Sequence, residues 1–530
     1  MFKFKYKVNS NTINALLSLY FCFLLNTSFF KCIFSNVNVV GVKSLFFCVN
    51  ISILSFFVHY VVLNILCFPY IFKGLVVLIL LISSFANFYM NEYSVFIDTD
   101  MIRNVFETNV NEAIDLINFK FVLYFVVFGL VPSIFILFQD VVYDKKFVRK
   151  KLLNTLHVMI FAVFSALIFY KQYAFFFRNN TEIRKLMNPE NWIYSTIRYF
   201  QNTYFVGREF KILDNDVVRV RDKNRTIFVL IVGETARASN FSLNGYERKT
   251  NPLLEKEDIV NFDNFYASGT STAVSVPLIF SVYDKNNFDV NRARYTENMI
   301  DLIDKSGMKV FWLENDGSCK NVCERVQTEI IDKLANKQYC NEESCFDEVM
   351  IDKMVDYINN TEGDLFIVLH MIGSHGPSYY KRYPESFSIY SPVCKTVELQ
   401  NCEKQNIVNA YDNTILYTDY FLSTVINKLK SLNETNVGML YVSDHGESLG
   451  ENGLYLHGIP YRIAPKYQLH IPMLIWMSDL AKSSIDYECL MNIRHDKFSH
   501  DNLFHSILGL LKIRTKVYDN KLDMFYKCRK

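Results

Sequence analysis

The chain has 530 residues, of which half are hydrophobic and 16% aromatic, and its formal net charge is +2. This length is too great for one ordinary domain and predicts two or three. The balanced charge, together with the lack of a compact basic motif, excludes nucleic acid as an expected partner. The composition is instead typical of a protein that is partly embedded in lipid and partly globular.

Five apolar stretches in the first third of the chain are long enough to cross a membrane, which takes about 20 mostly apolar residues. They cover residues 13–34, 45–66, 70–90, 119–138 and 153–176. One such stretch alone could be a buried core helix, but five in close succession predict a five-helix transmembrane domain over residues 1–177. The first stretch is too long for a cleaved signal peptide, and no small-residue cleavage site follows it.

Basic residues in the short loops set the expected orientation. They lie before the first stretch (Lys3, Lys5, Lys7) and between the fourth and fifth (Lys145, Lys146, Arg149, Lys150, Lys151). The loop between the third and fourth stretches is acidic. With an odd number of spans, we expect both basic regions in the cytoplasm and the C-terminal part of the chain outside it.

Residues 178–215 connect the last stretch to the rest of the chain. Aromatic residues such as Trp192 and Tyr199 alternate there with Arg184 and Arg198. This mixture favours bridging helices that lie at the membrane surface. A plain connector with a few packing aromatic residues is the alternative.

Residues 216–530 resemble a soluble α/β domain. Short apolar runs rich in branched and aromatic side chains occupy residues 226–232, 309–313, 365–372, 437–443 and 471–476, and helical patterns such as residues 407–432 separate them. Alternating strands and helices predict a central, mainly parallel sheet with helices on both faces.

Polar motifs directly follow three of these predicted strands. Glu234 follows the first, His375 the third, and the run from Asp444 and His445 to Glu447 the fourth. Because ligands of open α/β sheets bind at the carboxyl ends of the strands, these side chains can converge. Carboxylates and imidazoles are ligands for a divalent metal such as zinc. Each motif alone could equally be a turn whose polar groups are hydrogen-bonded within the protein, or a buried core histidine.

A hydroxyl-rich run, Ser268-Gly269-Thr270-Ser271-Thr272, precedes a predicted helix. The N-terminus of a helix attracts phosphate, and a threonine hydroxyl activated by a metal or a base can act as a nucleophile. The alternative is a turn that simply caps the helix.

Cysteines are distributed differently in the two parts of the chain. Four lie in or near the spans, whereas Cys319/Cys323, Cys340/Cys345 and Cys394/Cys402 form close pairs in the soluble part. We expect three short-loop disulfides in an oxidising compartment, with Cys489–Cys528 as a weaker fourth pairing. A cysteine metal site is the alternative, although no CxxC motif is present.

Five longer motifs carry a family resemblance: GETAR (residues 233–237), SGTSTAVSVP (268–277), HMIGSHGPSYYKRYP (370–384), NAYDNTILYTD (409–419) and SDHGESLGENGLYLHG (443–458). With them the chain resembles the membrane phosphoethanolamine transferases that modify lipid A, a group that includes enzymes conferring polymyxin resistance. These belong to the alkaline phosphatase and sulfatase superfamily. The resemblance covers nearly the whole soluble part and implies an alkaline-phosphatase-like fold there.

The resemblance also implies residue roles. Thr272 would be the nucleophile that carries phosphoethanolamine, and Glu234, Asp444 and His445 would hold one tightly bound Zn²⁺ together with Thr272. His375, His457 and Glu447 would bind phosphate or a second zinc ion. Lys320 occupies the position of a substrate-contacting lysine, and His370 matches a family position whose role the sequence does not define.

The implied reaction moves phosphoethanolamine from phosphatidylethanolamine to lipid A or another envelope acceptor, in the bacterial inner membrane with the catalytic domain in the periplasm. We expect a monomer. The first alternative is a phosphoglycerol transferase or another phosphodiester-cleaving membrane enzyme of the superfamily. A non-catalytic membrane sensor or scaffold is a more remote one.

Two positions depart from the family pattern. Many relatives have a disulfide beside the nucleophile, where this chain has Ser268 and Leu278. Asp316, four residues before Lys320, replaces an asparagine found in some relatives. The second departure affects the expected recognition of the headgroup.

Overall fold

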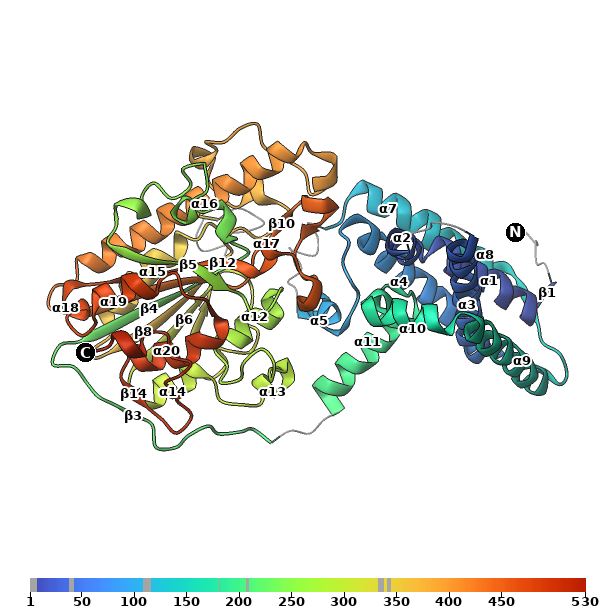
Figure 1. Cartoon of the computed structure of the whole chain (residues 1–530), viewed down its shortest axis with the longest axis horizontal. Helices are drawn as coiled ribbons and strands as arrows, with labels where there is room; N and C mark the ends of the chain where they lie inside the picture. The colour runs from blue at the N-terminus through green and yellow to red at the C-terminus, as the bar shows by residue number, and fades with distance from the viewer. Residues whose placement is uncertain are drawn as a thin grey trace. The chain divides into compact units, whose positions relative to one another are not determined.

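The computed structural model describes residues 7–37, 42–107, 116–180, 182–205, 209–331, 338–340 and 345–530. The chain forms two compact units (Figure 1). The membrane unit consists of Met1–Ile102 and Ile117–Gln201, and the sheet unit of Arg103–Leu116 and Asn202–Lys530.

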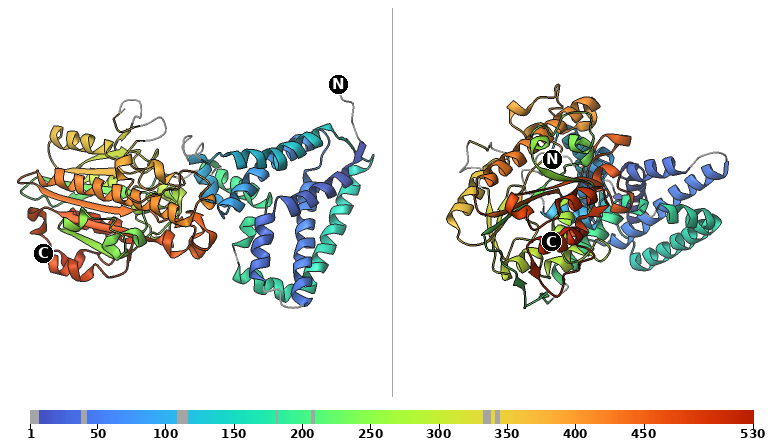
Figure 2. Two further views of the ribbon diagram at one scale, coloured as in Figure 1. Left: turned by 90° about the horizontal axis from the view of Figure 1, so that it is seen from above. Right: turned by 60° about the vertical axis from the view of Figure 1, so that its left-hand side comes forward.

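The membrane unit is helical, and α1 and α9 both pack along α3 within one bundle (Figure 2). Its helices are α1 (Ser10–Leu24), α2 (Thr27–Asn36), α3 (Val42–Leu66), α4 (Phe72–Glu92), α7 (Phe119–Phe125), α8 (Val131–Phe138), α9 (Phe147–Ile168), α10 (Tyr170–Asn179) and α11 (Glu190–Phe200), with α5 (Thr99–Glu107) shared between the units. Two short strands, β1 (Lys7–Asn9) and β2 (Asp140–Val142), pair in parallel.

Among the described residues, four helical segments are long and apolar enough to span a membrane, and the bent pair α1–α2 makes a fifth if it counts as one span. The predicted first span, residues 13–34, is therefore not continuous: the helix axes bend by 53°. Asn26 lies at the break, and its side-chain amide donates to the Phe21 carbonyl (2.9 Å), which competes with the helical hydrogen bonds there.

The predicted fifth span, residues 153–176, differs from the structure at both ends. Helix α9 begins earlier, at Phe147, and ends at Ile168, after which the chain turns into α10. Hydropathy marks the apolar part of a helix, whereas basic residues such as Lys150 continue the same helix without interrupting it.

An eight-stranded sheet lies at the centre of the sheet unit, in the order β13-β5-β12-β9-β4-β8-β6-β7. The strands are β4 (Thr226–Gly233), β5 (Ile259–Tyr266), β6 (Lys309–Glu314), β7 (Gln327–Ile330), β8 (Leu365–His370), β9 (Asn436–Ser443), β12 (His470–Met477) and β13 (Phe498–Ser499). The predicted mainly parallel sheet is confirmed, but β12 runs antiparallel to both of its neighbours. The sequence analysis missed β5, whose alternating burial reflects a strand near the sheet edge.

Two small strand pairs, β10–β11 and β3–β14, and the helices complete the unit. The short strands are β3 (Val218–Arg219), β10 (Ser448–Leu449), β11 (Tyr455–Leu456) and β14 (Ile513–Arg514). The helices are α12 (Thr272–Ile279), α13 (Val290–Arg294), α14 (Met299–Lys305), α15 (Val349–Asn360), α16 (Lys404–Lys430), α17 (Lys466–Leu469), α18 (Asp479–Lys482), α19 (Tyr487–Ile493) and α20 (Leu503–Leu510).

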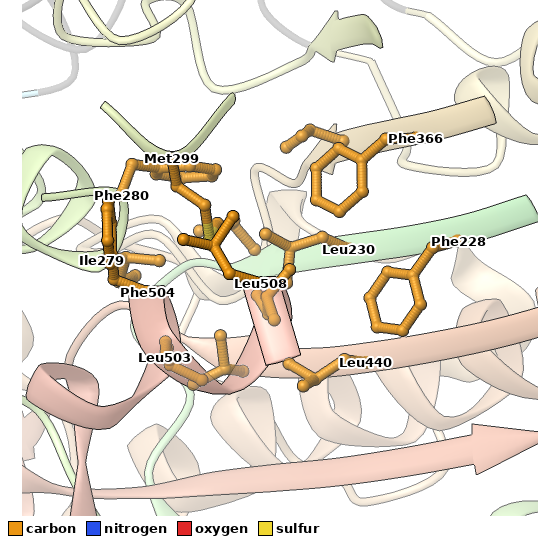
Figure 3. Close-up of a cluster of buried hydrophobic side chains, with 14 of the residues drawn as sticks. Phe228, Leu230, Ile279, Phe280, Met299, Phe366, Leu440, Leu503, Phe504 and Leu508 are labelled. Carbon is orange, nitrogen blue, oxygen red and sulfur yellow. The ribbon is translucent and has the colours of Figure 1, made fainter. Parts of the chain in front are cut away.

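Helices cover both faces of the sheet, as the sequence predicts. On one face, Phe228 and Leu230 of β4 pack with Ile279 of α12, Met299 of α14 and Leu508 of α20 (Figure 3). On the other face, the alternate β4 residues pack against α15 and α16. Because successive strand residues point to opposite faces, the fully buried β4 supplies both cores.

Four disulfides lie in the sheet unit: Cys319–Cys323, Cys340–Cys345, Cys394–Cys402 and Cys489–Cys528. The three short-loop pairings and the weaker fourth are thus confirmed. Cys22, Cys32, Cys48 and Cys67 of the membrane unit take part in none of these disulfides.

Candidate active site

The carboxyl ends of the central parallel strands meet at one edge of the sheet. Glu234 directly follows β4 and Asp444 directly follows β9, whose last residues, Gly233 and Ser443, are paired. On the other side of β4, β8 ends at His370, which pairs with Glu314 at the end of β6. The convergence expected from the sequence therefore follows from strand order and register.

Glu234 is held by a close approach of two backbone segments. The Ser374 N–H donates to the Glu234 carbonyl (3.0 Å). At Gly373, where φ is +48°, a Cβ would lie 2.7 Å from that same carbonyl oxygen. Only glycine is compatible with both the left-handed conformation and this approach.

The Asp444 carboxylate has one satisfied oxygen and one that faces the site. Its Oδ1 accepts the backbone N–H groups of Thr235 (3.1 Å) and His445 (2.7 Å). Its Oδ2 has no hydrogen-bond partner and lies 3.2 Å from His445 Nε2. The turn after β9 thus directs both side chains toward one point, as the adjacency of the two residues predicts.

His445 has a defined orientation. Its Nδ1 lies 2.9 Å from the Gly446 carbonyl, which can only accept, so Nδ1 carries the proton. Burial lowers the pKa of His445 to about 4, which keeps the ring neutral at physiological pH. The lone pair on Nε2 therefore faces the Glu234 and Asp444 carboxylates, the arrangement of a metal-binding histidine.

Glu234, Asp444 and His445 are all fully buried, and one ligand atom of each lies within 4.8 Å of the others. Glu234 Oε1 and Asp444 Oδ2 have no hydrogen-bond partner. Burial, and then repulsion by Asp444 and Asp316, raise the pKa of Glu234 well above its usual value. Two buried carboxylates and an imidazole nitrogen without a counter-charge between them fit a divalent metal ion.

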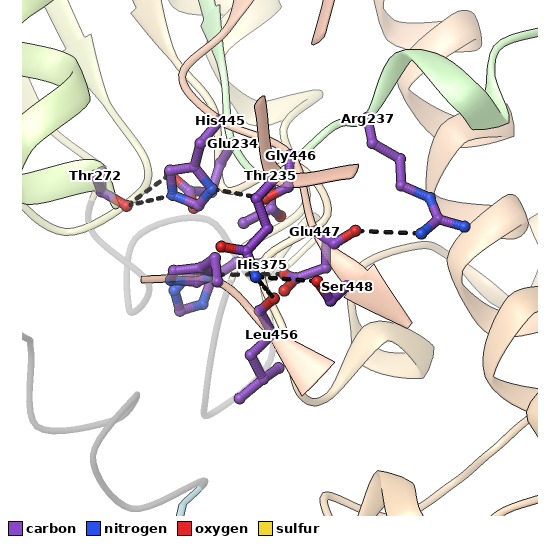
Figure 4. Close-up of polar contacts among 12 residues, drawn as sticks. Glu234, Thr235, Arg237, Thr272, His375, His445, Gly446, Glu447, Ser448 and Leu456 are labelled. Atoms are coloured by element: carbon purple, nitrogen blue, oxygen red, sulfur yellow. Dashed lines mark hydrogen bonds and ion pairs between the residues drawn. The ribbon is translucent and has the colours of Figure 1, made fainter. Parts of the chain in front are cut away.

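Thr272 is the first residue of α12 and faces this cluster (Figure 4). Its hydroxyl donates to Glu234 Oε2 (3.1 Å) and lies 3.5 Å from His445 Nε2. Ser271 occupies the N-cap position without a side-chain capping bond. The α12 N-terminus therefore presents a hydroxyl group and backbone N–H groups to the same point, which suits a phosphoryl group.

A second group of predicted residues lies beside His445 and consists of His375, His457 and Glu447. The ring centroids of His445 and His457 are 4.3 Å apart, and those of His375 and His457 are 6.1 Å apart. His457 Nδ1 lies 3.4 Å from Glu447 Oε2. Burial, and then the charge of Arg382, lower the pKa of His375 well below its usual value, and burial raises that of Glu447. The structure thus brings these three predicted residues together with the cluster.

Lys320 approaches from the loop closed by the Cys319–Cys323 disulfide, with a φ of 50°. Its charge contributes to the lowered pKa of His375, so it lies near the same site. His370 is on the sheet side of the cluster, where Nδ1 is 2.8 Å from Glu314 Oε2. Burial opposes the charged imidazolium, but Glu314 outweighs it and raises the pKa of His370 to about 9.

The sequence analysis missed two residues of the site. Glu314 ends β6, one residue beyond the predicted strand, and the signal was present: a polar residue after an apolar strand, as for Glu234. Arg237, inside the GETAR motif, donates to the Glu447 carbonyl (3.2 Å) and to the Glu451 carboxylate (2.7 Å). Both residues hold others in place.

A mainly parallel sheet with acidic and imidazole ligands at its carboxyl edge, facing a hydroxyl group on a helix N-terminus, defines the class of sulfatase-like enzymes. Residues 226–513 match the family model described as sulfatase. Residues 55–204 match the model described as phosphoethanolamine transferase EptA/EptB.

Similarity to individual proteins shows where this chain belongs among the sulfatase-like enzymes. Phosphoethanolamine transferase EptA of Escherichia coli K12 is 36% identical over 526 residues, which cover 97% of this chain and 96% of that protein. Phosphatidylethanolamine transferase Mcr-1 of E. coli is 35% identical over 77% of this chain and 79% of its own length. The integral membrane lipooligosaccharide phosphoethanolamine transferase A of Neisseria meningitidis superposes with a TM-score of 0.96 at 36% identity, covering 99% of this chain and all of that one. The chain belongs to the EptA family of phosphoethanolamine transferases.

Proposed function

We propose that this enzyme transfers phosphoethanolamine from phosphatidylethanolamine to lipid A through a covalent intermediate on Thr272. The observation that carries the proposal is the position of the Thr272 hydroxyl, 3.1 Å from Glu234 and 3.5 Å from His445 at the start of α12. The donor agrees with the name of the Mcr-1 relative, and a lipid-linked acceptor agrees with that of the N. meningitidis transferase.

Glu234, Asp444 and His445 would hold a zinc ion together with Thr272. The partnerless Glu234 Oε1 and Asp444 Oδ2, and the unprotonated Nε2 of His445, supply the ligand atoms that zinc prefers. When bound, zinc lowers the pKa of a hydroxyl group and offsets the charge that develops on the phosphoryl oxygens.

Thr272 supplies the nucleophile in the first half of the reaction. A bond forms between Thr272 Oγ1 and the donor phosphorus, the bond from phosphorus to the diacylglycerol oxygen breaks, and diacylglycerol leaves with the proton. In the second half, an oxygen of the acceptor attacks the same phosphorus from the opposite side. The bond to Thr272 breaks and its hydroxyl regains a proton. A negatively charged acceptor group or a sugar hydroxyl can serve as the attacking oxygen.

His375, His457, Lys320 and Glu447 would bind the transferred group. A lysine ammonium forms charge-assisted hydrogen bonds with phosphoryl oxygens. His375 Nδ1 is buried and has no hydrogen-bond partner, so it has a position free for such a ligand. Glu447 Oε1 is likewise buried without a partner and would attract the ethanolamine ammonium. His370 would support the site from behind, through Glu314.

The arrangement of the chain suits two lipid substrates. We place a transmembrane domain at residues 1–177, bridging helices at 178–215 and the catalytic domain at 216–530. The enzyme would act as a monomer in the bacterial inner membrane, with the catalytic domain in the periplasm, where disulfides form. Attachment to the membrane raises the effective concentration of donor and acceptor at the active site.

A transfer assay with the purified full-length enzyme in detergent tests the proposal. The donor is headgroup-labelled phosphatidylethanolamine and the acceptor is lipid A. We expect release of diacylglycerol, a phosphoethanolamine mass increment on lipid A, and an adduct on a peptide that contains Thr272. Chelation of zinc should stop all three.

The matched variants are Thr272→Ala and Thr270→Ala, because the two threonines are neighbours with the same exposed fraction of 9%. Thr272→Ala should abolish transfer and adduct, whereas Thr270→Ala should retain transfer within a few-fold. Release of diacylglycerol without modification of lipid A would support phosphatidylethanolamine as the donor and exclude lipid A as the acceptor. If neither release nor adduct occurs, the donor is wrong, and phosphatidylglycerol is the next donor to examine.

A further inference from the structure

Glu234 belongs also to a second group of buried potential ligands, in which Asp316 and His370 have no part as ligands in the proposed reaction. One ligand atom each of Glu234, Asp316 and His370 lies within 4.8 Å of the others. All three side chains are at most 4% exposed. The group lies where β6 and β8 end, whereas the ring of His457 lies against that of His445, with centroids 4.3 Å apart.

The orientation of His370 points to a ligand. Its Nδ1 donates to Glu314 Oε2 (2.8 Å), and Glu314 is itself fixed by the Trp312 indole N–H (2.9 Å). A histidine that binds a metal usually donates its other ring N–H to a carboxylate in this way. His370 Nε2 is fully buried, has no hydrogen-bond partner, and lies 4.0 Å from Asp316 Oδ2.

The negative charges of the neighbouring carboxylates also favour a bound cation. Asp316 and Asp444 both repel the Glu234 carboxylate inside the protein. Carboxylates that are buried together are stable only when cations or hydrogen bonds offset their charge. The Glu314 oxygen that accepts the Asp316 backbone N–H (2.9 Å) fixes the position of Asp316 beside His370.

We propose that Glu234, Asp316 and His370 bind a second divalent transition-metal ion, and that Glu234 is shared between this ion and the one held with Asp444 and His445. Two carboxylate oxygens and one imidazole nitrogen suit zinc or manganese. His370 binds the ion through Nε2, while its Nδ1 N–H keeps the hydrogen bond to Glu314 Oε2. A cation here offsets the negative charge of Asp316.

Binding of Mn²⁺ to the full-length enzyme in detergent tests the inference without any transfer reaction, so its outcome is separate from that of the proposed function. The protein is stripped with a chelator, loaded with one equivalent of Zn²⁺, and titrated with Mn²⁺ while electron paramagnetic resonance measures free Mn²⁺. We expect one further ion to bind. In Asp316→Asn the affinity for that ion should fall by more than about 10-fold.

Glu314→Gln is the second variant, because it leaves all three ligands and removes only the carboxylate that orients His370. It should weaken Mn²⁺ binding by about 10–100-fold, the effect of losing an outer partner of a metal ligand. His457→Gln is the control, since His457 belongs to the other group, and it should retain the Mn²⁺ affinity of the unmodified enzyme.

Thermal melting distinguishes lost binding from misfolding. Without metal, Asp316→Asn should melt no lower than the unmodified enzyme, because it removes a like charge. Mn²⁺ should raise the melting temperature of the unmodified enzyme but not that of Asp316→Asn. The inference is overturned if Asp316→Asn binds Mn²⁺ as tightly as the unmodified enzyme, or if His457→Gln alone abolishes binding. In that case His370 forms only an ion pair with Glu314 and Asp316.

Discussion

The two units bury polar groups of different kinds. In the membrane unit they are mainly neutral amides, hydroxyls and an imidazole, several of which are hydrogen-bonded across helices: Asn14 donates to Asn64 (3.0 Å) and Asn50 to Ser165 (2.7 Å). In the sheet unit, Glu234, Asp316 and Asp444 gather at one strand edge. Neutral groups can be paired with one another within the chain, whereas like charges that are buried together must be offset by a cation or by hydrogen bonds.

The largest effect is expected from Glu234→Gln. It removes a shared metal ligand and the acceptor of the Thr272 hydroxyl, and should lower transfer by at least about 10³-fold, since a bound metal contributes several kcal/mol. Without metal, the variant should melt at or above the temperature of the unmodified enzyme. Zinc should raise the melting temperature of the unmodified enzyme only.

Asp419→Asn is the matched control for Glu234→Gln. Asp419 is also a buried carboxylate, but its two oxygens accept the N–H groups of Leu253 and Leu254 (2.9 Å each). Its replacement should lower the melting temperature equally with and without zinc. If Glu234→Gln also lowers the melting temperature equally with and without zinc, Glu234 does not differ from a hydrogen-bonded buried carboxylate such as Asp419.

The next effect concerns the disulfides. Replacing Cys489 and Cys528 by serine opens a loop with a sequence separation of 39 and should lower the free energy of unfolding by about 4 kcal/mol. The same change at Cys394 and Cys402, separated by eight residues, should lower it by about 2.5 kcal/mol. Denaturant unfolding measures both values. Equal losses would contradict the loop-entropy explanation.

A third effect is a dependence on pH that comes from His505. Burial lowers the pKa of His505 to about 4, and its Nδ1 accepts the Asp519 N–H (3.1 Å). The unfolded chain binds the proton below about pH 6.5, so the contribution to stability is present above that pH and is lost as the pH falls to 4.

We expect this contribution to reach about 3 kcal/mol. His505→Asn keeps an acceptor for Asp519 but cannot titrate. The difference in unfolding free energy between pH 7 and pH 4 should therefore be smaller in the variant by about that amount. An unchanged difference would exclude His505 as the source.

The smallest effect is expected in the membrane unit. Asn26 donates to the Phe21 carbonyl and accepts the Asn188 N–H (2.9 Å each). Polar contacts between membrane helices contribute about 0.6 kcal/mol on average and at most about 2. Asn26→Ala should lower stability in detergent by this amount, independently of zinc. A stability loss that depends on zinc would contradict the proposed difference, in which only the sheet unit is stabilised by a bound cation.

Much of the fold could be predicted because it depends on local pattern. The apolar stretches mark the membrane unit, and runs such as residues 226–232 mark the strands, since burial on both faces requires continuous apolar sequence. Strand β5 was missed because it alternates, and the antiparallel direction of β12 has no local signal at all. The bend at Asn26 was missed for a similar reason, since hydropathy does not register a side chain that bonds to its own helix.

Local sequence patterns identify the residues that can take part in the chemistry. Glu234, Thr272, Asp444 and His445 are readable because polar and hydroxyl groups directly follow apolar strands or precede a helix, and strand ends meet at one edge of a parallel sheet. Only the tertiary structure decided which oxygens remain without partners and that Glu314 fixes His370 beside Asp316. The reason is physical: hydrogen-bond satisfaction and repulsion between buried charges depend on distances of a few ångströms between strands far apart in sequence, and no local pattern encodes them.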